Sequence, residues 1–280
     1  MSVVVSAPAA RVASPLRWAG GKRWLRPLIE DLVNGAEFSA YHEPFLGGAS
    51  VFLGLPQFSK AYLRDTNSEL IETFRVIRDT PTAVAAQVRQ YANDKDTYYK
   101  VRASLPSTKL ERAVRFIYLN HTSYNGIYRV NLNGVYNVPF GARKSPQIPT
   151  SDHLHQVSAR LKTATLSVGD FASCLKHVGK GDLVFLDPPY TVAHNNNGFV
   201  KYNQRLFSFE DQKRLSELVD EIKERDAYYI LTNAAHDSIK KLFHRSDRLM
   251  ETNRRNSIGG INAARGTATE YLFTNLPLKT

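Results

Sequence analysis

The sequence predicts an α/β fold in which buried strands alternate with helices. Its clearest strand is Leu183–Leu186, four apolar residues in a row, as expected for a strand that is buried on both faces. Prolines 188 and 189 must end this strand, because proline cannot donate to a sheet ladder. A second strand, Tyr41–Phe45, leads into Gly47-Gly48 and is expected to continue into a helix. A strand, a glycine turn and a helix in this order are the first unit of a nucleotide-type α/β sheet.

The remaining elements are expected on both sides of these two. We predict a helix through about Asn34 and further strands at Ala61–Arg64, Ala164–Val168, Tyr228–Leu231 and Tyr271–Thr274. From about Ser68 to Asn120, apolar residues recur at helical spacing and no strand pattern interrupts them, which predicts a helical insertion between strands of the sheet. Ser208, with Asp211 three residues later, predicts the start of a helix that runs to about Arg225.

The composition narrows the class of partner. Among 280 residues, Lys and Arg number 37 against 26 Asp and Glu, a net charge of +11, which indicates nucleic acid rather than a membrane surface. No apolar run approaches the roughly 20 residues that a bilayer span needs. Cys174 is the single cysteine, which excludes an internal disulfide and fits a reducing cytoplasm. Residues 1–14 lack the features of a signal peptide and are expected to form a flexible tail.

Acidic residues follow two of the predicted strands. Asp187 and Tyr190 come directly after Leu183–Leu186, where open α/β sheets bind their ligands. Asp65 follows Ala61–Arg64, about twenty residues after the glycine turn, a spacing that suits a carboxylate accepting hydrogen bonds from ribose hydroxyls. Two structural alternatives stay open. Asp65 could cap the following helix, and Asp187 could be an incidental acid before a Pro-Pro turn.

Residues 121–144 combine tyrosines, asparagines and basic side chains. Asn133-Gly134 between Val130–Leu132 and Val135–Val138 predicts a β-hairpin. Amides can read base edges, tyrosines can stack and cations can contact phosphates, so the segment suits nucleic acid. The alternative is a surface hairpin with ordinary turn residues. Residues 254–260 predict a second basic segment, a flexible loop near the carboxyl terminus.

Several other chemistries are not supported. The glycines lack the spacing of a triphosphate-binding Walker loop, and the chain has neither a Gly-x-Ser-x-Gly elbow nor a Cys–His pairing for covalent catalysis. His153 and His155 have no third ligand nearby and are expected on a solvated helix face, so we predict no metal. Without an acidic cluster at metal-ligand spacing, a nuclease is a weak alternative.

Six motifs, taken together and in this order, resemble the Dam-type (D12 class) DNA adenine-N6 methyltransferases, which use S-adenosylmethionine. The resemblance covers Pro15 to about Asn275, and its motifs are Arg17–Lys22, Glu43–Phe52, Asp65–Asn67, Asn120–Gly126, Asn137–Gly141 and Asp187–Tyr190. It implies a Rossmann-like methyltransferase sheet with a mostly helical DNA-recognition insertion that carries a β-hairpin. The implied domains are a catalytic domain, residues 15–67 and 164–280, and a target-recognition domain, residues 68–163.

The same resemblance implies the residues of the active site. Those that would bind S-adenosylmethionine, and its product S-adenosylhomocysteine, are Trp18, Lys22, Phe45, Gly47, Asp65, Asp170, Phe171 and Asp187. In catalysis the Asp187 carboxylate and the Pro188 carbonyl would accept hydrogen bonds from the amino group of a flipped adenine, on which Tyr190 would stack. Ala49 departs from the family, where many relatives have glycine, and is expected to be tolerated at negative φ.

The resemblance also implies double-stranded DNA as the partner, with GATC as the candidate target. The candidate DNA contacts are Tyr128, Arg129, Asn131, Asn133, Arg143, Lys144, Arg254 and Arg255. We expect a cytoplasmic monomer in a prokaryotic or phage-infected cell, with a companion restriction endonuclease as a candidate partner. Two alternatives remain, a methyltransferase for another planar amino group such as cytosine N4, and a DNA-binding protein on this fold without catalysis.

Overall fold

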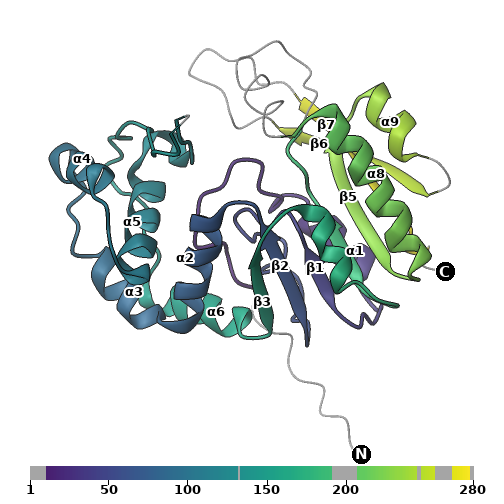
Figure 1. Ribbon diagram of the computed structural model, residues 1–280, viewed down its shortest axis with the longest axis horizontal. Helices are drawn as coiled ribbons and strands as arrows, with labels where there is room; N and C mark the ends of the chain where they lie inside the picture. Colours follow the sequence, from purple (N-terminus) through teal and green to yellow (C-terminus); the bar gives the residue numbers. More distant parts are fainter. Residues whose placement is uncertain (1–10, 132, 191–206, 245–246, 256–266, 278–280) are drawn as a thin grey trace, which may run out of the picture. The chain divides into compact units, whose positions relative to one another are not determined.

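The computed structural model describes residues 11–131, 133–190, 207–244, 247–255 and 267–277. In chain order its elements (Figure 1) are α1 (Arg26–Val33), β1 (Tyr41–Glu43), β2 (Ala61–Asp65), α2 (Ser68–Asp79), α3 (Pro81–Val88), α4 (Lys95–Ala103), α5 (Lys109–Thr122), the 3-10 turn η1 (Tyr124–Gly126), α6 (Ser151–Leu161), β3 (Ala164–Val168), η2 (Phe171–Lys176), β4 (Leu183–Leu186), α8 (Phe209–Glu224), β5 (Tyr228–Ala234), α9 (Asp237–Phe243), β6 (Arg248–Arg255) and β7 (Thr267–Thr274).

The strands form a mixed sheet in the order β3-β2-β1-β4-β5-β7-β6. β4 runs parallel to β1 and β5, with Leu183 opposite Tyr41 on one side and Tyr228 on the other. β7 is antiparallel to both β5 and β6. The strand order reverses between β1 and β4, and open α/β sheets bind ligands outside the carboxyl ends of the strands at such a point. The predicted α/β class is confirmed, as are the six strands expected from the sequence.

The chain divides into two compact units. The first comprises Met1–Glu30, Leu46–Ser59 and Leu63–Gly169, and the second comprises Asp31–Phe45, Lys60–Tyr62 and Asp170–Thr280. These bounds describe packing, whereas the catalytic and target-recognition domains expected from the sequence are defined by function. The boundaries of those functional domains stay a prediction.

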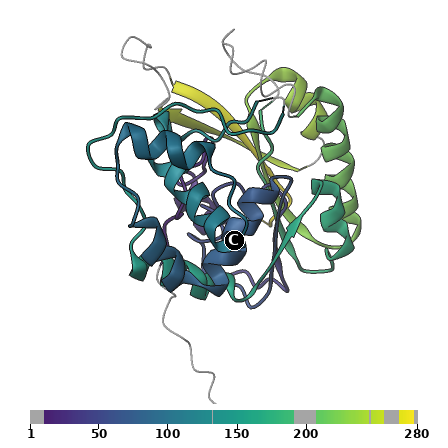
Figure 2. The ribbon, with the colours of Figure 1, turned by 60° about the vertical axis from the view of Figure 1, so that its left-hand side comes forward.

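Helices α2 to α6 of the first unit confirm the expected helical insertion. α2 packs against α5 and α6, and α3 packs against the same two helices (Figure 2, blue and teal). The apolar face of α2 is buried, including Leu70, Ile71, Phe74 and Ile77, all 0 % exposed. Residues at this spacing share one face of a helix, so their burial is what stabilises a helix of this length. Thr108 and Glu111 form a capping box that fixes the start of α5.

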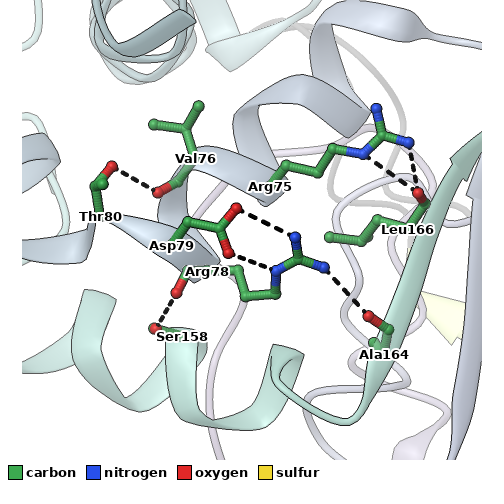
Figure 3. A network of polar contacts seen from close by, with 8 residues as sticks. All are labelled: Arg75, Val76, Arg78, Asp79, Thr80, Ser158, Ala164 and Leu166. Carbon is green, nitrogen blue, oxygen red and sulfur yellow. Dashed lines mark hydrogen bonds and ion pairs between the residues drawn. The ribbon is translucent and has the colours of Figure 1, made fainter.

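A network of arginine hydrogen bonds fixes the carboxyl end of α2 (Figure 3). The Arg75 guanidinium donates to the Leu166 carbonyl at 2.6 and 3.2 Å, and Arg78 donates to the Ala164 carbonyl at 3.4 Å. On the other side, the Ser158 hydroxyl of α6 donates to the Arg78 carbonyl at 2.6 Å. Because these bonds use main-chain carbonyls of β3, they hold α2 against the strand and satisfy groups that would otherwise be unpaired.

The second unit has its own apolar core. Residues of η2, β4, α8, β5 and β7 meet there, including Phe171, Val184, Leu186, Leu215, Val219, Tyr229, Leu231 and Phe273. All four residues of β4 are buried, as the sequence predicts. The expected capping box at Ser208 and Asp211 is also confirmed, with α8 beginning at Phe209. Strands β4 and β5 are therefore held in place by a closely packed apolar core.

The sequence predicts a helix after the glycine turn that follows β1. The structure instead has isolated turns over residues 47–55. Gly47 and Ala49 have φ angles of +47° and +56°, and two left-handed residues so close together cannot lie within a right-handed helix. Ala49 therefore does not meet the condition of negative φ under which its methyl group was expected to be tolerated. Its methyl group is fully buried, at 0 % exposure, so packing offsets the roughly 1 to 2 kcal/mol that a left-handed alanine costs.

The predicted hairpin is reduced to a turn with two isolated antiparallel bridges in the described part of 121–144, Val130 with Tyr136 beside the turn and Ser123 with Phe140 farther from it. Gly134 has φ of +74° and its N–H donates to the Asn131 carbonyl, so the predicted turn itself is confirmed. The Asn131 side chain accepts hydrogen bonds from the main-chain N–H groups of Asn133 and Val135, at 3.0 and 2.9 Å. These N–H groups therefore bond to a side chain near the turn rather than to main-chain carbonyls of a strand ladder.

The basic segment near the carboxyl terminus begins in a strand rather than a loop. Arg254 and Arg255 are the last residues of β6, opposite Ala268 and Thr267 of β7, while residues 256–260 lie outside the described part. β6 lies at the end of the strand order, where charged residues are common in strands. At the other terminus, residues 1–10 lie outside the described part. Within the expected tail of residues 1–14, Val12 is already buried, at 4 % exposure.

Candidate active site

Asp65, the last residue of β2, holds the start of the glycine turn. Its carboxylate accepts hydrogen bonds from the main-chain N–H groups of Gly47 and Asn67, each at 2.9 Å. The cap of α2 is Asn67, whose side chain accepts from the Leu70 N–H at 3.0 Å, so the alternative of Asp65 as the cap is wrong. Burial raises the pKa of the Asp65 carboxyl, and the main-chain hydrogen bonds oppose that rise. A half-buried carboxylate with a perturbed pKa is typical of binding sites.

The two glycines of the turn make room for Trp18. A Cβ atom on Gly47 would lie 2.7 Å from Cδ1 of the indole, and one on Gly48 would lie 3.0 Å from the Trp18 Cβ. Gly47 also has positive φ, so any side chain there would be strained as well as crowded. In this structure the group that lies against these two glycines is the indole.

The segment before Trp18 is fastened to the end of α5. Asn120 brackets Arg17, accepting from its N–H at 2.7 Å and donating to its carbonyl at 2.8 Å. The His121 Nε2 lies 2.9 Å from the Pro15 carbonyl, so that nitrogen carries the proton and donates. Both side chains are buried, which makes these main-chain contacts strong determinants of where the segment runs. The Asn-His pair of the sequence motif therefore positions Trp18.

Two aromatic rings pack against Trp18. Its indole stacks on Tyr128 at 5.7 Å between ring centroids and on Phe116 at 6.5 Å. The Tyr128 hydroxyl donates to the Glu69 carboxylate at 2.6 Å, and burial, followed by this hydrogen bond, raises the tyrosine pKa. Tyr128, which the sequence suggested as a DNA contact, therefore packs against both Trp18 and Tyr136.

Lys22 is buried at the end of the Trp18–Lys22 loop. Only 2 % of its surface is exposed, and its ammonium donates to the Gly20 carbonyl at 3.1 Å. A buried ammonium needs polar partners, and the loop carbonyl supplies one of them. In the first unit, the structure thus brings together Trp18, Gly47 and Asp65, and it places Lys22 in the same loop as Trp18.

In the second unit, Phe45 stacks on Phe171, with 5.2 Å between ring centroids and 24° between planes. Asp170, just before Phe171, accepts from the Ala172 N–H at 3.0 Å and from the Arg214 guanidinium at 2.8 Å. Arg214 also lies over the Phe171 ring, 4.8 Å from its centroid. Phe45 and Phe171 are therefore in contact, and Arg214 contacts both Phe171 and the neighbouring Asp170.

Asp187 directly follows β4 and is held by the neighbouring strand. The Thr232 hydroxyl of β5 donates to Asp187 Oδ1 at 2.7 Å. Pro188 is buried beside it, and its missing N–H leaves only a carbonyl to form hydrogen bonds. The alternative that Asp187 is an incidental acid before a turn does not account for a fully buried hydroxyl that donates to it.

Tyr190 is anchored by a carboxylate on β7. Its hydroxyl donates to Glu270 at 2.6 Å, and Glu270 is only 4 % exposed. A second tyrosine–carboxylate pair lies on β1, where the buried Tyr41 hydroxyl donates to Glu43 at 2.8 Å. Burial raises the pKa of Tyr41 well above its usual value, and the charges of Glu43 and, to a smaller extent, Asp187 raise it further. Acidic side chains therefore gather around the carboxyl ends of β1 and β4.

The candidate DNA contacts differ in how they are held. Arg129 is exposed and donates from Nε to the Asn137 side chain at 2.8 Å. Asn131 is committed to the turn, as described above, whereas Asn133 and Lys144 are exposed. Arg143 is half-buried, and its carbonyl accepts from Asn93 at 2.7 Å. The side chains of Arg254 and Arg255 lie outside the described part.

Thr232, Glu270 and Arg214 were not found by sequence reasoning. Thr232 interrupts the apolar run of β5, and a polar residue inside a buried strand is the one signal that singles it out. Glu270 lies in a strand of mixed polarity and Arg214 on a charged helix, where neither residue type stands out. Their partners are 80 and 44 residues away in the chain, so only the folded sheet brings them together.

Within the described ranges, no group of three or more His, Cys, Asp or Glu side chains is arranged to hold a metal ion.

Among the helices of the described residues, none is both long and apolar enough to cross a bilayer.

Comparison with known proteins gives consistent results. The family model for D12 class N6 adenine-specific DNA methyltransferases matches residues 18–258. A type II methyltransferase of Lactococcus lactis subsp. cremoris is 32 % identical over 92 % of this chain and 94 % of its own length. A DNA adenine methylase of Escherichia coli K12 is 30 % identical over 94 % of this chain and 95 % of its own. With a family match of this extent, the chain belongs to the D12 class of N6 adenine-specific DNA methyltransferases.

Proposed function

We propose that this member of the family transfers the methyl group of S-adenosylmethionine to N6 of an adenine that is flipped out of double-stranded DNA. The observation that carries the proposal is the carboxylate of Asp187. It follows β4 at the point where the strand order reverses, it precedes a buried proline, and a buried threonine fixes its orientation. A base inside the duplex cannot reach such a group, so extrusion of the adenine is part of the proposal.

The role of Asp187 follows from the chemistry of the amino group. Adenine N6 is a poor nucleophile because its lone pair is delocalised into the ring. The Asp187 carboxylate and the Pro188 carbonyl can each accept a hydrogen bond from one N–H of the amino group. Two such acceptors favour a tetrahedral nitrogen whose lone pair is available for attack, and the fixed φ of proline orients the carbonyl in advance. When bound, S-adenosylmethionine supplies a methyl group that its sulfonium already activates.

The candidate cofactor contacts are proposed from the sequence resemblance and are described for each unit by itself. In the first unit, Trp18, Lys22, Gly47 and Asp65 are the candidates, with Asp65 as acceptor for the ribose hydroxyls. The support for Asp65 is its half-buried carboxylate, which binds the start of the glycine turn through the Gly47 N–H and keeps further acceptor sites for ribose hydroxyls. In the second unit, the candidates are Phe45 for the methionine and ribose, Asp170 and Phe171 for the adenine ring, and Asp187.

DNA contacts are proposed from residues 128–144 and from β6. Arg129, Asn133 and Lys144 are exposed, which fits side chains that meet phosphates or base edges. Tyr128, Asn131 and Arg143 are proposed to act mainly by shaping the segment that carries them. Arg254 and Arg255 stay candidates for phosphate contacts. Binding that depends on these cations should weaken steeply with salt.

The biological setting is also a proposal. We propose a cytoplasmic monomer that acts on DNA. The Lactococcus relative is named as a type II methyltransferase, which supports a companion restriction endonuclease, whereas the Escherichia coli relative is named only as a DNA adenine methylase. GATC is the target that we would test first.

The experiment uses the purified protein, tritiated S-adenosylmethionine and a plasmid library without N6-methyladenine. We expect label in DNA, and single-molecule sequencing should find N6-methyladenine within one short motif. Methylation at cytosine N4, or none in any sequence, would remove the proposed reaction. A motif other than GATC would correct the target only.

A further inference from the structure

Thr232 lies beside Asp187 because of the register between β4 and β5. Leu186 is opposite Leu231, so the next position along each strand brings Asp187 next to Thr232. Thr232 is 0 % exposed, and its hydroxyl lies 2.7 Å from Asp187 Oδ1 and 3.5 Å from the Leu186 carbonyl. A hydroxyl has a single proton, and the much shorter distance assigns it to the carboxylate.

The Thr232 side chain is well fixed. β5 pairs with β4 on one side and with β7 on the other, where Thr232 is opposite Leu272. A β-branched side chain in a strand has few allowed χ1 rotamers, so its hydroxyl points in a defined direction. An aspartate carboxylate, by contrast, rotates about a broad χ2 well and needs an external partner to define its plane. The threonine is therefore the rigid member of the pair.

We propose that Thr232 is a positioning residue for methyl transfer: its hydroxyl sets the plane of the Asp187 carboxylate, so that this group meets the adenine amino group in the reactive orientation. The inference rests on the proposed function of Asp187. A hydrogen bond from a hydroxyl to a carboxylate is short and charge-assisted, so it holds the carboxylate more firmly than a bond between neutral groups would.

Thr232→Val removes the hydroxyl and keeps the shape and β-branching of the side chain. Misorientation of a reacting group by about an ångström can cost a factor of roughly a hundred in rate. We therefore expect the single-turnover rate of methyl transfer to fall by about ten- to a hundredfold in Thr232→Val and by less than about threefold in Thr232→Ser. The dissociation constant for DNA should stay near that of the wild type in both variants.

A second pair of variants separates the hydroxyl from packing. Both Thr232→Ser and Thr232→Ala lack the threonine methyl group, and only the alanine variant also lacks the hydroxyl. Their rate ratio therefore reports on the hydroxyl even if the valine variant folds poorly. A double-mutant comparison with Asp187→Asn adds a further test. If Thr232 acts through Asp187, Thr232→Val should slow this already impaired enzyme much less than it slows the wild type.

The outcomes distinguish this inference from the proposed function. Full-rate transfer by Thr232→Val, or equal losses in the serine and alanine variants, would overturn the role of Thr232 and leave the reaction itself intact. Absence of transfer by the wild type would instead remove the proposed function. We expect slow methyl transfer by Thr232→Val and fast transfer by Thr232→Ser. We also expect Thr232→Val to slow the Asp187→Asn enzyme much less than it slows the wild type.

Discussion

The two units hold their candidate site residues by different means. In the first unit, main-chain groups do most of the work. Two N–H groups bind Asp65, two main-chain groups of Arg17 bind Asn120, and glycine backbone gives the space for Trp18. In the second unit, side chains hold side chains, with Thr232 on Asp187 and Glu270 on Tyr190.

This difference predicts different responses to mutation. Where main-chain groups position a site residue, a mutation alters the site only by disturbing the path of the main chain. Protein stability and ligand binding should therefore fall together. Where one side chain orients another, removal of a single atom can alter the rate and leave the fold in place. The four predictions below test this contrast, from the largest expected effect to the smallest.

Asp187→Ala should reduce methyl transfer by more than about a thousandfold, because it removes one of the two acceptors for the adenine amino group. The melting temperature should change little, since Asp187 is only half-buried. Tritium transfer from S-adenosylmethionine and a thermal melt measure the two effects. Near-normal turnover would remove the mechanism.

Gly47→Ala should weaken cofactor binding by roughly a hundredfold, because the new methyl group displaces the Trp18 indole. It should also lower the free energy of unfolding by about 2 kcal/mol, through crowding and positive φ combined. Gly134→Ala is the matched control. Gly134 has φ of +74° but nothing within 4 Å of the added Cβ, so it should cost about 1 kcal/mol of strain and leave cofactor affinity unchanged. Equal effects at both sites would show that the indole contact is unimportant.

Asn120→Ala should lower the free energy of unfolding by about 2 to 3 kcal/mol, since it leaves both main-chain groups of Arg17 without their partner. The Michaelis constant for S-adenosylmethionine should rise at the same time, because Trp18 loses its anchor. Asn93→Ala, which removes one hydrogen bond to the Arg143 carbonyl, is the control for loss of an asparagine. If the Michaelis constant for S-adenosylmethionine rose as much in Asn93→Ala as in Asn120→Ala, a specific role for Asn120 would be contradicted.

Tyr190→Phe should slow methyl transfer by a few-fold only, on the order of three- to tenfold, because the ring remains available for stacking while its anchor to Glu270 is lost. Steady-state kinetics with varied DNA measure this. The Glu270→Gln variant keeps an acceptor oxygen for the Tyr190 hydroxyl, so its rate of methyl transfer should fall less than that of Tyr190→Phe. If Tyr190→Phe matched the wild type, the Glu270 contact would have no part in catalysis.

The strands could be predicted because their signals are local. Leu183–Leu186 is a short apolar run closed by two prolines, and Ser208 with Asp211 is a capping pattern within four residues. β6 was missed because an edge strand tolerates arginine and asparagine, which leave no apolar alternation to detect. The positive φ of Ala49 could not be predicted, because a left-handed alanine is stabilised by burial, which no local pattern records.

The candidate site could be predicted only in part, for a similar reason. Asp65 and Asp187 are recognisable because each acid follows a strand. Their partners are not, since Gly47 lies 18 residues from Asp65 and Thr232 lies 45 residues from Asp187. Such pairs depend on strand register, which is set by the whole sheet rather than by the residues themselves.

The position of Trp18 has a practical consequence for optical measurements. The chain contains two tryptophans, Trp18 and Trp24, and Trp18 is stacked on two aromatic rings beside the glycine turn. In a Trp24→Phe background the tryptophan fluorescence of the protein would come from this one indole. Its emission would then report directly on events at the turn, without an added dye.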